Sequence, residues 1–231
     1  MVAMQDSNTL GAMLLFRGLT PEQLSTLSGL LRRRTVPAGA TLMLAEDMGE
    51  VAYLILSGTV KIALDQADGS EMILALLGPG EIVGEMSLVD RQGRSAGVVT
   101  QEACTLLALD RSTFERCLQT MPVLPLNLVR LLARRLRLAN AQIEALGTLD
   151  IYGRVARQIL AFAHEYGEPL GDGALRIPLR LTQSDIAGLV GASRVRVNQV
   201  MVAYKRRKYI SVDHAYRITV HNVAALAKRC Q

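Results

Sequence analysis

Between Thr35 and Asp110 the chain consists of short apolar runs, rich in Val, Ile, Leu and Thr, that are separated by regularly spaced glycines. This rhythm is typical of an antiparallel barrel or jelly roll, in which each short strand ends at a turn. The runs at residues 60–64 and 72–76 predict a hairpin, with Gln66-Ala67-Asp68-Gly69 as its turn. The glycines of this segment that mark the predicted turns are Gly39, Gly49, Gly58, Gly69, Gly78 and Gly80.

The stretch from residue 80 to residue 96, Gly-Glu-Ile-Val-Gly-Glu-Met-Ser-Leu-Val-Asp-Arg-Gln-Gly-Arg-Ser-Ala, interrupts the strand pattern. A guanidinium such as that of Arg94 pairs bidentately with phosphate oxygens, and a carboxylate such as that of Glu85 accepts hydrogen bonds from ribose hydroxyls. A short helix that opens near Gly84 would direct its N-terminus at the same anion. The alternative is a surface turn in which Glu85 and Arg94 pair only with each other.

Helical patterns flank the strand region on both sides. Thr20 and Gln23 form a capping box, and Pro21 suits the first position, of a helix that we expect to end at the basic run Arg32-Arg33-Arg34. After a turn bracketed by Pro122 and Pro125, a long helix is predicted to about Leu149. Apolar residues on this helix follow a heptad spacing, which favours pairing with a second copy; packing of the helix on its own barrel is the alternative. The seam comprises Val129, Leu132, Leu136, Ala139, Ile143 and Leu146.

The last part of the chain carries a helix-turn-helix spacing. Asp150 is predicted to cap a helix that runs to about Tyr166, and a strand pair is expected at residues 175–177 and 179–181. Thr182 and Ser193 are suitable N-caps for two further helices, and Gly191 suits the tight turn between them. A hairpin wing is predicted at residues 209–212 and 216–220.

One face of the second of these helices is predicted to be core and the opposite face to be free for contact. The core face comprises Val197, Val200, Met201 and Tyr204, and the opposite face comprises Val195, Asn198, Gln199, Val202 and Arg206. Arg194 lies at the N-terminal tip. The run Lys205-Arg206-Arg207-Lys208 extends the basic surface.

The charge is distributed unevenly along the chain. Residues 1–150 contain 13 Lys and Arg against 16 Asp and Glu, whereas residues 151–231 contain 13 against 5, a balance of +8. Such a contrast indicates that only the last third meets a polyanion. The three cysteines, at 104, 117 and 230, have no metal-ligand spacing. No leader pattern and no apolar run of membrane-spanning length occurs, so we expect a soluble, cytoplasmic protein.

Taken in this order, the motifs resemble those of the cyclic-AMP receptor protein/FNR (CRP/FNR) family of bacterial transcription regulators. The resemblance rests on Gly84-Glu85-Met86-Ser87-Leu88 followed by Arg94-Ser95-Ala96, on Ala133-Arg134-Arg135-Leu136, on Leu149-Asp150-Ile151-Tyr152-Gly153-Arg154 and on Val190-Gly191-Ala192-Ser193-Arg194. It implies an α+β chain with an N-terminal β-roll (jelly-roll) cyclic-nucleotide-binding domain at residues 1–121. A dimerisation helix and hinge at 122–149 and a winged helix-turn-helix DNA-binding domain at 150–231 would follow.

The resemblance also implies roles for individual residues in effector binding. Arg94 and Ser95 would hold the cyclic phosphate, Glu85 the ribose hydroxyl and Gly84 a backbone contact, with Met86 and Ser87 completing the phosphate-binding cassette. Where the family usually has adjacent hydroxyl residues that meet the adenine, this chain has Ala139 and Asn140. Asn140 can donate and accept hydrogen bonds, but Ala139 cannot. The expected effector is cAMP, with cGMP or another small anion left open.

The expected DNA contacts are Gln183, Ser193, Arg194, Val195, Arg196, Asn198 and Gln199. In the family pattern Ser-Arg-Glu-x-Val-x-Arg, the Arg is kept as Arg194, whereas the Glu is replaced by Val195 and the last Arg by Gln199. Val contacts a thymine methyl and Gln prefers adenine, so the operator is expected to shift toward A·T pairs. The resemblance further implies a homodimer on a two-fold related operator in double-stranded DNA, and contact with RNA polymerase.

Other functions fit the sequence less well. An iron–sulfur sensor of this family needs an N-terminal cysteine cluster, and a haem sensor a histidine in the barrel, whereas the three histidines lie at 164, 214 and 221. A 2-oxoglutarate sensor, or a regulator that binds DNA without an effector, remains an alternative. No Walker loop or nucleophile elbow occurs, so we do not expect an enzyme.

Overall fold

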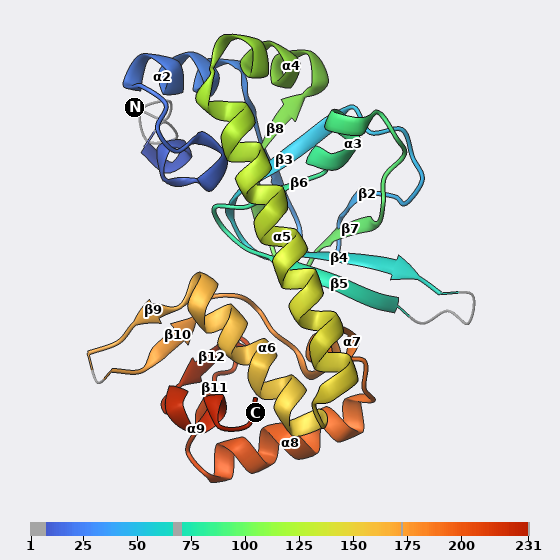
Figure 1. Ribbon diagram of the computed structural model, residues 1–231, viewed down its shortest axis with the longest axis vertical. Coiled ribbons are helices and arrows are strands. Elements are labelled where there is room, and N and C mark those ends of the chain that lie inside the picture. The colour runs from blue at the N-terminus through green and yellow to red at the C-terminus, as the bar shows by residue number, and fades with distance from the viewer. Residues whose placement is uncertain (1–7, 67–70, 172, 231) are drawn as a thin grey trace. The chain divides into compact units, whose positions relative to one another are not determined.

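The computed structural model describes residues 8–66, 71–171 and 173–230. The chain divides into two compact units, the first made of Met1–Leu64 and Leu76–Leu138 and the second of Asp65–Ala75 and Ala139–Gln231. Figure 1 shows the order of elements along the chain: a β-roll, one long helix and a C-terminal helical region with a small sheet. This order confirms the predicted α+β fold class.

Two four-stranded antiparallel sheets make up the roll, in the orders β1-β8-β3-β6 and β2-β7-β4-β5. Buried side chains from both sheets, among them Met43, Ile55 and Val98, belong to one apolar cluster, so the core of the roll lies between the sheets. The turn predicted at Gln66-Ala67-Asp68-Gly69 lies outside the described residues, except for Gln66. The strands are β1 (Arg32–Val36), β2 (Thr41–Met43), β3 (Val51–Ser57), β4 (Val60–Asp65), β5 (Glu71–Leu77), β6 (Ile82–Val83), β7 (Gly97–Thr100) and β8 (Cys104–Asp110).

The basic run near the N-terminus corrects one expectation. Helix α2 (Pro21–Leu30) begins with the predicted capping box, in which Thr20 and Gln23 bond each other's backbone N–H groups. It ends before the three arginines, however, which lie in β1 and pair with β8 from Arg32↔Ala108 onward. These arginines are exposed, and charged side chains are suited to an edge strand because they discourage pairing with another chain. The 3-10 helix η1 (Leu14–Phe16) precedes α2.

Three more helices belong wholly or partly to the first unit: α3 (Glu85–Asp90), α4 (Arg111–Thr120) and the long α5 (Val123–Thr148). Helix α5 begins two residues before Pro125, not after it, and proline is tolerated there because the N–H that it lacks would have no intrahelical partner in the first turn. One face of α5 packs into the core of the first unit through Leu124, Leu128 and Leu131.

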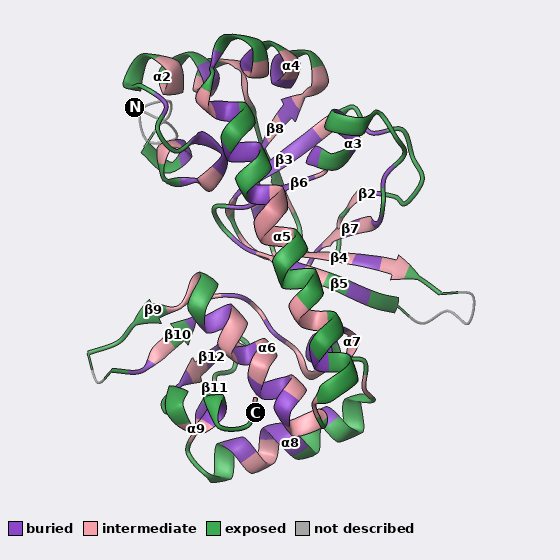
Figure 2. Cartoon of the chain, in the orientation of Figure 1, coloured by how far each residue is buried: buried purple, intermediate pink, exposed green. Residues whose placement is uncertain are grey.

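Another side of α5 is exposed. Val129, Leu136 and Ile143 are spaced seven residues apart, and their exposed fractions are 62%, 63% and 68%. Figure 2 shows buried and exposed segments alternating along this helix. The interpretation that α5 packs on its own barrel is therefore confirmed, and the seam residue Leu132 takes part in that packing, whereas pairing with a second copy stays a prediction.

The second unit contains a four-stranded antiparallel sheet, β11-β12-β10-β9. The expected pairing of residues 175–177 with 179–181 is wrong, because β10 pairs with β9 and β12 instead. Leu179 and Leu181 are buried residues of a connecting segment, and the N–H of Leu181 donates to the carbonyl of Tyr216. The elements are α6 (Ile151–Tyr166), β9 (Glu168–Pro169), β10 (Leu175–Ile177), α7 (Gln183–Val190), α8 (Arg194–Arg206), β11 (Ile210–Val212), β12 (Ile218–Val220) and α9 (Val223–Ala227).

Side chains from two helices hold the C-terminal end of α7. Gln142 of α5 donates to the carbonyl of Leu189, and Arg154 of α6 donates to that of Val190 at 2.9 Å. The predicted N-cap of α6 is confirmed, since Asp150 Oδ1 accepts from the N–H of Gly153 at 2.7 Å. Among the helices described, none is both long and apolar enough to cross a membrane.

Candidate functional site

The buried guanidinium of Arg94 is the centre of the polar stretch. Arg94 is only 8% exposed, and it donates to the main-chain carbonyls of Gly84, at 2.8 Å, and Val51. Within the part of the chain that the structure describes, it forms no salt bridge with a carboxylate. Burial lowers its pKa, but an arginine side chain stays protonated at neutral pH. A buried cation whose hydrogen-bond partners are neutral main-chain carbonyls provides a favourable position for an anion.

Two glycines let the backbone approach Arg94 closely. Gly84 is the N-cap of α3 with φ +84°, and a Cβ at this position would lie 2.7 Å from Arg94 Nη1 and against the end of Met43. A Cβ at Gly49 would lie 2.8 Å from Arg94 Cζ and 2.8 Å from Ser87 Oγ. Only residues without a side chain fit here, so both glycines are needed for the packing of the guanidinium.

Glu85 does not pair with Arg94, contrary to the surface-turn alternative. Its side chain is 2% exposed and forms a salt bridge with Arg135 of α5. Arg135 also donates to Glu81, at 3.2 Å, and to the carbonyl of Ile82, while Arg134 pairs with the other oxygen of Glu81. Two carboxylates of the polar stretch are thus joined to two arginines of the long helix.

The resemblance assigned Arg134 and Arg135 only to the dimer helix, with no contact to the polar stretch. The structure instead places both at the junction with the polar stretch, where 24% of the Arg135 side chain is exposed. The only signal in the sequence is two adjacent cations on a helix that follows a carboxylate pair with spacing Glu-x-x-x-Glu. The separation of about fifty residues carries no local information on that pairing.

The other predicted effector residues occupy different environments. Ser87 is buried and donates to the carbonyl of Gly93 at 3.4 Å, whereas Ser95 is exposed and its hydroxyl lies 3.9 Å from Met86 Sδ. Gly84, Glu85, Met86, Ser87, Arg94 and Ser95 are therefore brought together around α3. Ala139 and Asn140 are exposed residues of α5 that belong to the second unit.

In the second unit, the predicted helix-turn-helix forms from α7 and α8. Thr182 and Ser193 cap these helices through their side chains, and Gly191 ends α7 in the left-handed conformation with φ +60°. The predicted core face of α8, which is Val197, Val200, Met201 and Tyr204, is buried. The Tyr204 hydroxyl donates to the carbonyl of Tyr152 at 2.7 Å, which ties α8 to α6.

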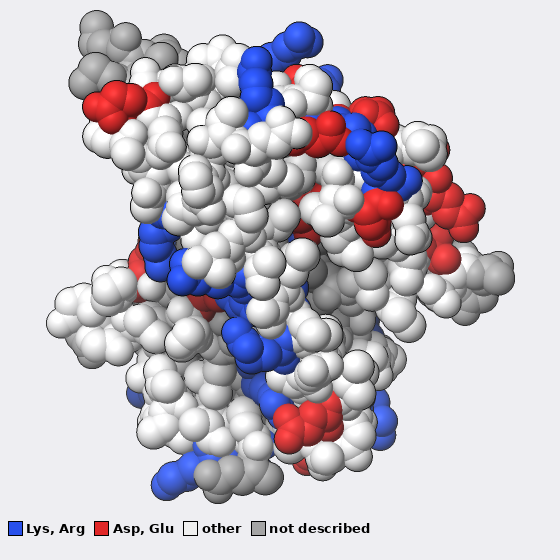
Figure 3. Space-filling view, turned by 45° about the horizontal axis from the view of Figure 1, so that its top comes forward, with Lys and Arg blue, Asp and Glu red and all other residues white. Residues whose placement is uncertain are grey.

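The predicted contact residues of α8 lie on its free side. The exposed residues are Ser193, Arg194, Val195, Arg196, Asn198 and Gln199, and the exposed fraction of Val195 reaches 68%. Gln183 of α7 donates to Asn198 Oδ1 at 2.8 Å, so the Asn198 amide N–H groups remain available as donors. On the face shown in Figure 3, Lys and Arg form separate clusters among mainly neutral residues.

The wing follows α8 as the hairpin of β11 and β12. Asp213 organises its tip by accepting from the N–H groups of Ala215 and Arg217 at 2.9 and 2.8 Å. The guanidinium of Arg180 lies 4.9 Å from the ring centroid of Tyr216, within the range of a cation–π contact. In the described residues no cluster of His, Cys, Asp and Glu has the arrangement of a metal site.

Comparison with known families assigns both units. The pattern of the "Cyclic nucleotide-binding domain" family matches residues 33–121, and that of the "Crp-like helix-turn-helix domain" matches residues 153–229. The first match contains the polar stretch with Arg94 and Glu85, and the second contains the whole of α7 and α8.

Individual proteins match most of the chain. The CRP-like cAMP-activated global transcriptional regulator of Mycobacterium tuberculosis is 34% identical over 217 residues, which cover 94% of this chain and 96% of that protein. The cyclic AMP receptor protein of Thermus thermophilus is 36% identical over 189 residues, covering 82% and 84%. Among solved structures, FixK2 from Bradyrhizobium japonicum shares the fold with a TM-score of 0.76 at 18% identity, covering 87% of this chain and 98% of that one.

Proposed function

Because the chain belongs to the CRP/FNR family of bacterial transcription regulators, a family of DNA-binding proteins and not of enzymes, we propose that it is a homodimeric regulator whose DNA binding responds to cAMP. In this proposal residues 1–121 bind the effector, residues 122–149 form the dimerisation helix and hinge, and residues 150–231 bind DNA. The protein would act in the cytoplasm, where the DNA and RNA polymerase are found.

The observation that carries the effector proposal is the buried guanidinium of Arg94 with main-chain carbonyls as its hydrogen-bond partners. A cyclic phosphate has one negative charge and two free oxygens, which match the fork of a guanidinium. Backbone N–H groups at the start of α3, which follows Gly84 in its left-handed conformation, would donate to the same phosphate. Ser95, which is exposed next to Arg94, would add a hydroxyl donor.

Glu85 is the proposed acceptor for the ribose hydroxyl. Its pairing with Arg135 supports a coupling between effector and long helix, since a hydroxyl that bonds Glu85 must share the carboxylate with Arg135 or displace it. Either outcome changes the contacts between the cassette and α5. This gives the effector a means of biasing one of two states of the dimer.

Selectivity for adenine over guanine is the least constrained part of the proposal. Ala139 offers no polar group to a base, whereas Asn140 offers both a donor and an acceptor. Cyclic AMP is the effector named for the two sequence relatives, and it is therefore the first effector to test. Cyclic GMP is the matched comparison, because it has the same phosphate and ribose.

The dimer is proposed from the exposed seam of α5. Apolar residues at seven-residue spacing on a helix that already packs its other face into the core are suited to a parallel coiled coil with a second copy. Two copies of α8 related by a two-fold axis would then reach successive major grooves of one operator, about one DNA turn apart.

DNA binding would draw on the basic composition of residues 151–231, with sequence preference from Arg194, Asn198 and Gln199. Neutralisation of phosphates releases counterions, so the affinity should fall steeply as salt is raised. An affinity that does not change with salt would contradict this part of the proposal.

Isothermal titration calorimetry with cAMP tests the effector site. We expect wild-type protein to bind and Arg94→Leu to lose at least tenfold in affinity, about 1.4 kcal/mol, because the anion loses its charged partner. Arg94→Lys should bind with intermediate affinity, since it keeps the charge and loses the fork. Circular dichroism establishes that the variants are folded. Equal affinity of wild type and folded Arg94→Leu would remove Arg94 from the site.

One observation favours a second candidate, a regulator that binds DNA without an effector. The carboxylate of Glu85 already has a partner in Arg135, so the cassette is partly satisfied by the chain itself. In that case the affinity for the operator would be the same with and without cAMP. The two candidates therefore differ in a single measurable quantity.

A further inference from the structure

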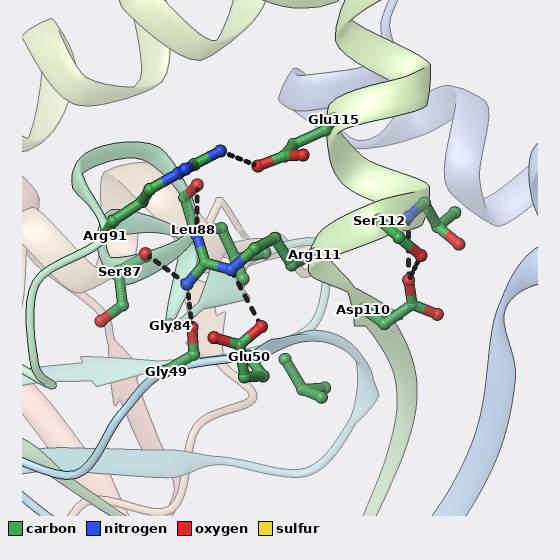
Figure 4. Close-up of polar contacts among 12 residues, drawn as sticks. Gly49, Glu50, Gly84, Ser87, Leu88, Arg91, Asp110, Arg111, Ser112 and Glu115 are labelled. Atoms are coloured by element: carbon green, nitrogen blue, oxygen red, sulfur yellow. Dashed lines mark hydrogen bonds and ion pairs between the residues drawn. The ribbon is translucent and has the colours of Figure 1, made fainter.

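Arg111 is the first residue of α4. It is not one of the residues proposed to bind the effector. Only 16% of its side chain is exposed. Its guanidinium donates through Nε to Glu50 Oε2 at 2.9 Å, through Nη1 to the carbonyl of Leu88 at 3.1 Å, and through Nη2 to the carbonyls of Gly49 and Ser87 at 2.6 and 3.1 Å. Figure 4 shows these four contacts converging on the one guanidinium.

These contacts join two segments that are far apart in the sequence. Ser87 and Leu88 belong to α3, a helix of six residues, in which the carbonyl of Ser87 also accepts from the N–H of Arg91 at 3.2 Å and that of Leu88 lies in the last turn. Gly49 and Glu50 belong to the connection between β2 and β3. The main chain adds a further bond, from the N–H of Arg111 to the carbonyl of Glu50 at 2.9 Å. Arg111 thus fixes this connection and α3 against the start of α4.

The connection that Arg111 holds is also the one that holds Arg94. The N–H of Arg94 donates to the carbonyl of Asp47 at 2.9 Å, and its carbonyl accepts from Glu46 at 2.8 Å. Gly49 lies between Ser87 and the Arg94 guanidinium so closely that a Cβ would contact both. A shift of Gly49 or Ser87 therefore changes the packing around the Arg94 guanidinium.

A second link between α3 and α4 provides a contrast. Arg91 pairs with Glu115 at 3.1 Å, but 74% of the Arg91 side chain is exposed, and exposed pairs contribute little. Gly49, Ser87 and Leu88 are buried, and loss of the Arg111 donor leaves the carbonyls of Gly49 and Leu88 unsatisfied, whereas that of Ser87 keeps the N–H of Arg91. The two links are therefore expected to differ in their effect on the position of α3.

We propose that Arg111 is a positioning residue for the anion site, which holds α3 and the β2–β3 connection in the arrangement that aligns the Arg94 guanidinium with an incoming phosphate. The proposal deepens the proposed function and rests on it for the identity of the ligand. It places no contact between Arg111 and the ligand. Its effect is transmitted through Gly49, Ser87 and Leu88.

The test compares Arg111→Met and Arg111→Lys with Arg116→Met, a variant that removes the same charge from an exposed position of the same helix. Hydrogen–deuterium exchange without ligand is measured first, at a temperature where all variants are folded. For Arg111→Met we expect faster exchange confined to residues 46–50 and 85–94, with β3 and β8 unchanged. Arg116→Met should exchange like wild type.

Calorimetry with cAMP is the second readout. We expect Arg111→Met to weaken binding at least tenfold and Arg111→Lys to weaken it less, because a single ammonium keeps the charge but cannot reach all four acceptors. If Arg111→Met does not fold, Arg111→Lys decides: wild-type exchange and wild-type affinity in that variant would overturn the proposal. A purely stabilising role would lower the melting temperature and leave the affinity of the folded protein unchanged.

The two readouts separate the failure of this proposal from the failure of the proposed function. If wild-type protein and Arg116→Met do not bind cAMP, the proposed function is wrong, and the exchange data still show whether Arg111 holds the cassette. If both bind cAMP and folded Arg111→Met binds equally well, the assignment of Arg111 is wrong and the effector site stands.

Discussion

Arg135 of α5 donates to the buried carboxylate of Glu85 at the start of α3, which joins the long helix to the segment proposed to bind the effector. The Glu85 side chain is 2% exposed and that of Arg135 is 24% exposed, so the pair is only slightly screened by water. The pair therefore links Glu85, the proposed acceptor for the ribose hydroxyl, directly to α5, the helix that carries the apolar seam.

Loss of one partner of this pair should destabilise the protein. Arg135→Met removes the ion-pair partner of the buried Glu85 carboxylate, and we expect the free energy of unfolding to fall by roughly 3 kcal/mol. The double variant Glu85→Gln, Arg135→Met should regain part of this loss because the uncompensated charge is removed. Urea unfolding followed by circular dichroism measures both. A double variant less stable than the single one would contradict the account.

A methyl group at Gly84 should weaken anion binding, in addition to lowering stability through backbone strain. Gly84→Ala puts a Cβ against Met43 and Arg94 in a left-handed conformation, whereas Gly39→Ala has a similar φ of +75° with no neighbouring atom within 4 Å. Both should lose about 1–2 kcal/mol of stability. Only Gly84→Ala should weaken cAMP binding, by at least tenfold in calorimetry. Equal affinities in the two variants would separate Gly84 from the site.

The N-cap of α4 gives a prediction on pH. Asp110 Oδ1 accepts from the N–H of Thr113 at 2.8 Å, and this bond holds the pKa of the Asp110 carboxyl below its usual value of 3.8. Because the folded-state pKa is the lower one, the carboxylate stabilises the fold above pH 3.8, and this contribution is lost as the pH falls through the folded-state pKa. Asp110→Ala should be about 1 kcal/mol less stable than wild type at pH 7.

The difference between Asp110→Ala and wild type should shrink as urea unfolding is repeated from pH 5 downward. Asp110→Asn is the control, since asparagine caps a helix without a charge and should show a pH-independent difference. A deficit of Asp110→Ala that stays constant below pH 3.8 would show that the carboxylate is not the stabilising species.

The exposed residues of α8 predict an operator that differs from the usual half-site of the family. Val195 and Gln199 are exposed on α8 where the family pattern has Glu and Arg, and they favour thymine and adenine contacts. Selection from random DNA should return half-sites that are shifted toward A·T pairs at those positions. Val195→Glu with Gln199→Arg should restore the usual half-site. Recovery of the usual half-site by the wild-type protein would refute the prediction.

Features that depend on neighbours in the sequence were predictable. The caps at Thr20, Asp150, Thr182 and Ser193 each join a side chain to a backbone group three residues away, so the residue types alone identify them. The buried face of α8 follows from helical periodicity in the same way. The family resemblance and the fold class were confirmed as well.

Features decided by distant partners were not predictable. The run Arg32-Arg33-Arg34 became a strand because residues 106–108 of β8 pair with it, and nothing local to the arginines indicates this. The Arg135–Glu85 pair spans fifty residues, and the contacts of Arg111 span up to 62. The roles of these arginines depend on where the roll brings α3, α4 and α5 together, which the sequence pattern alone does not define.

The central claim is that a small anion at Arg94 controls DNA binding, and the affinity for a selected operator with and without cAMP tests it most directly. Fluorescence anisotropy on the wild-type protein, at one fixed salt concentration and with cGMP in parallel, should show at least tenfold tighter binding with cAMP and no change in Arg94→Leu. An operator affinity that is the same with cAMP, with cGMP and with neither would contradict the claim and favour a regulator that needs no effector.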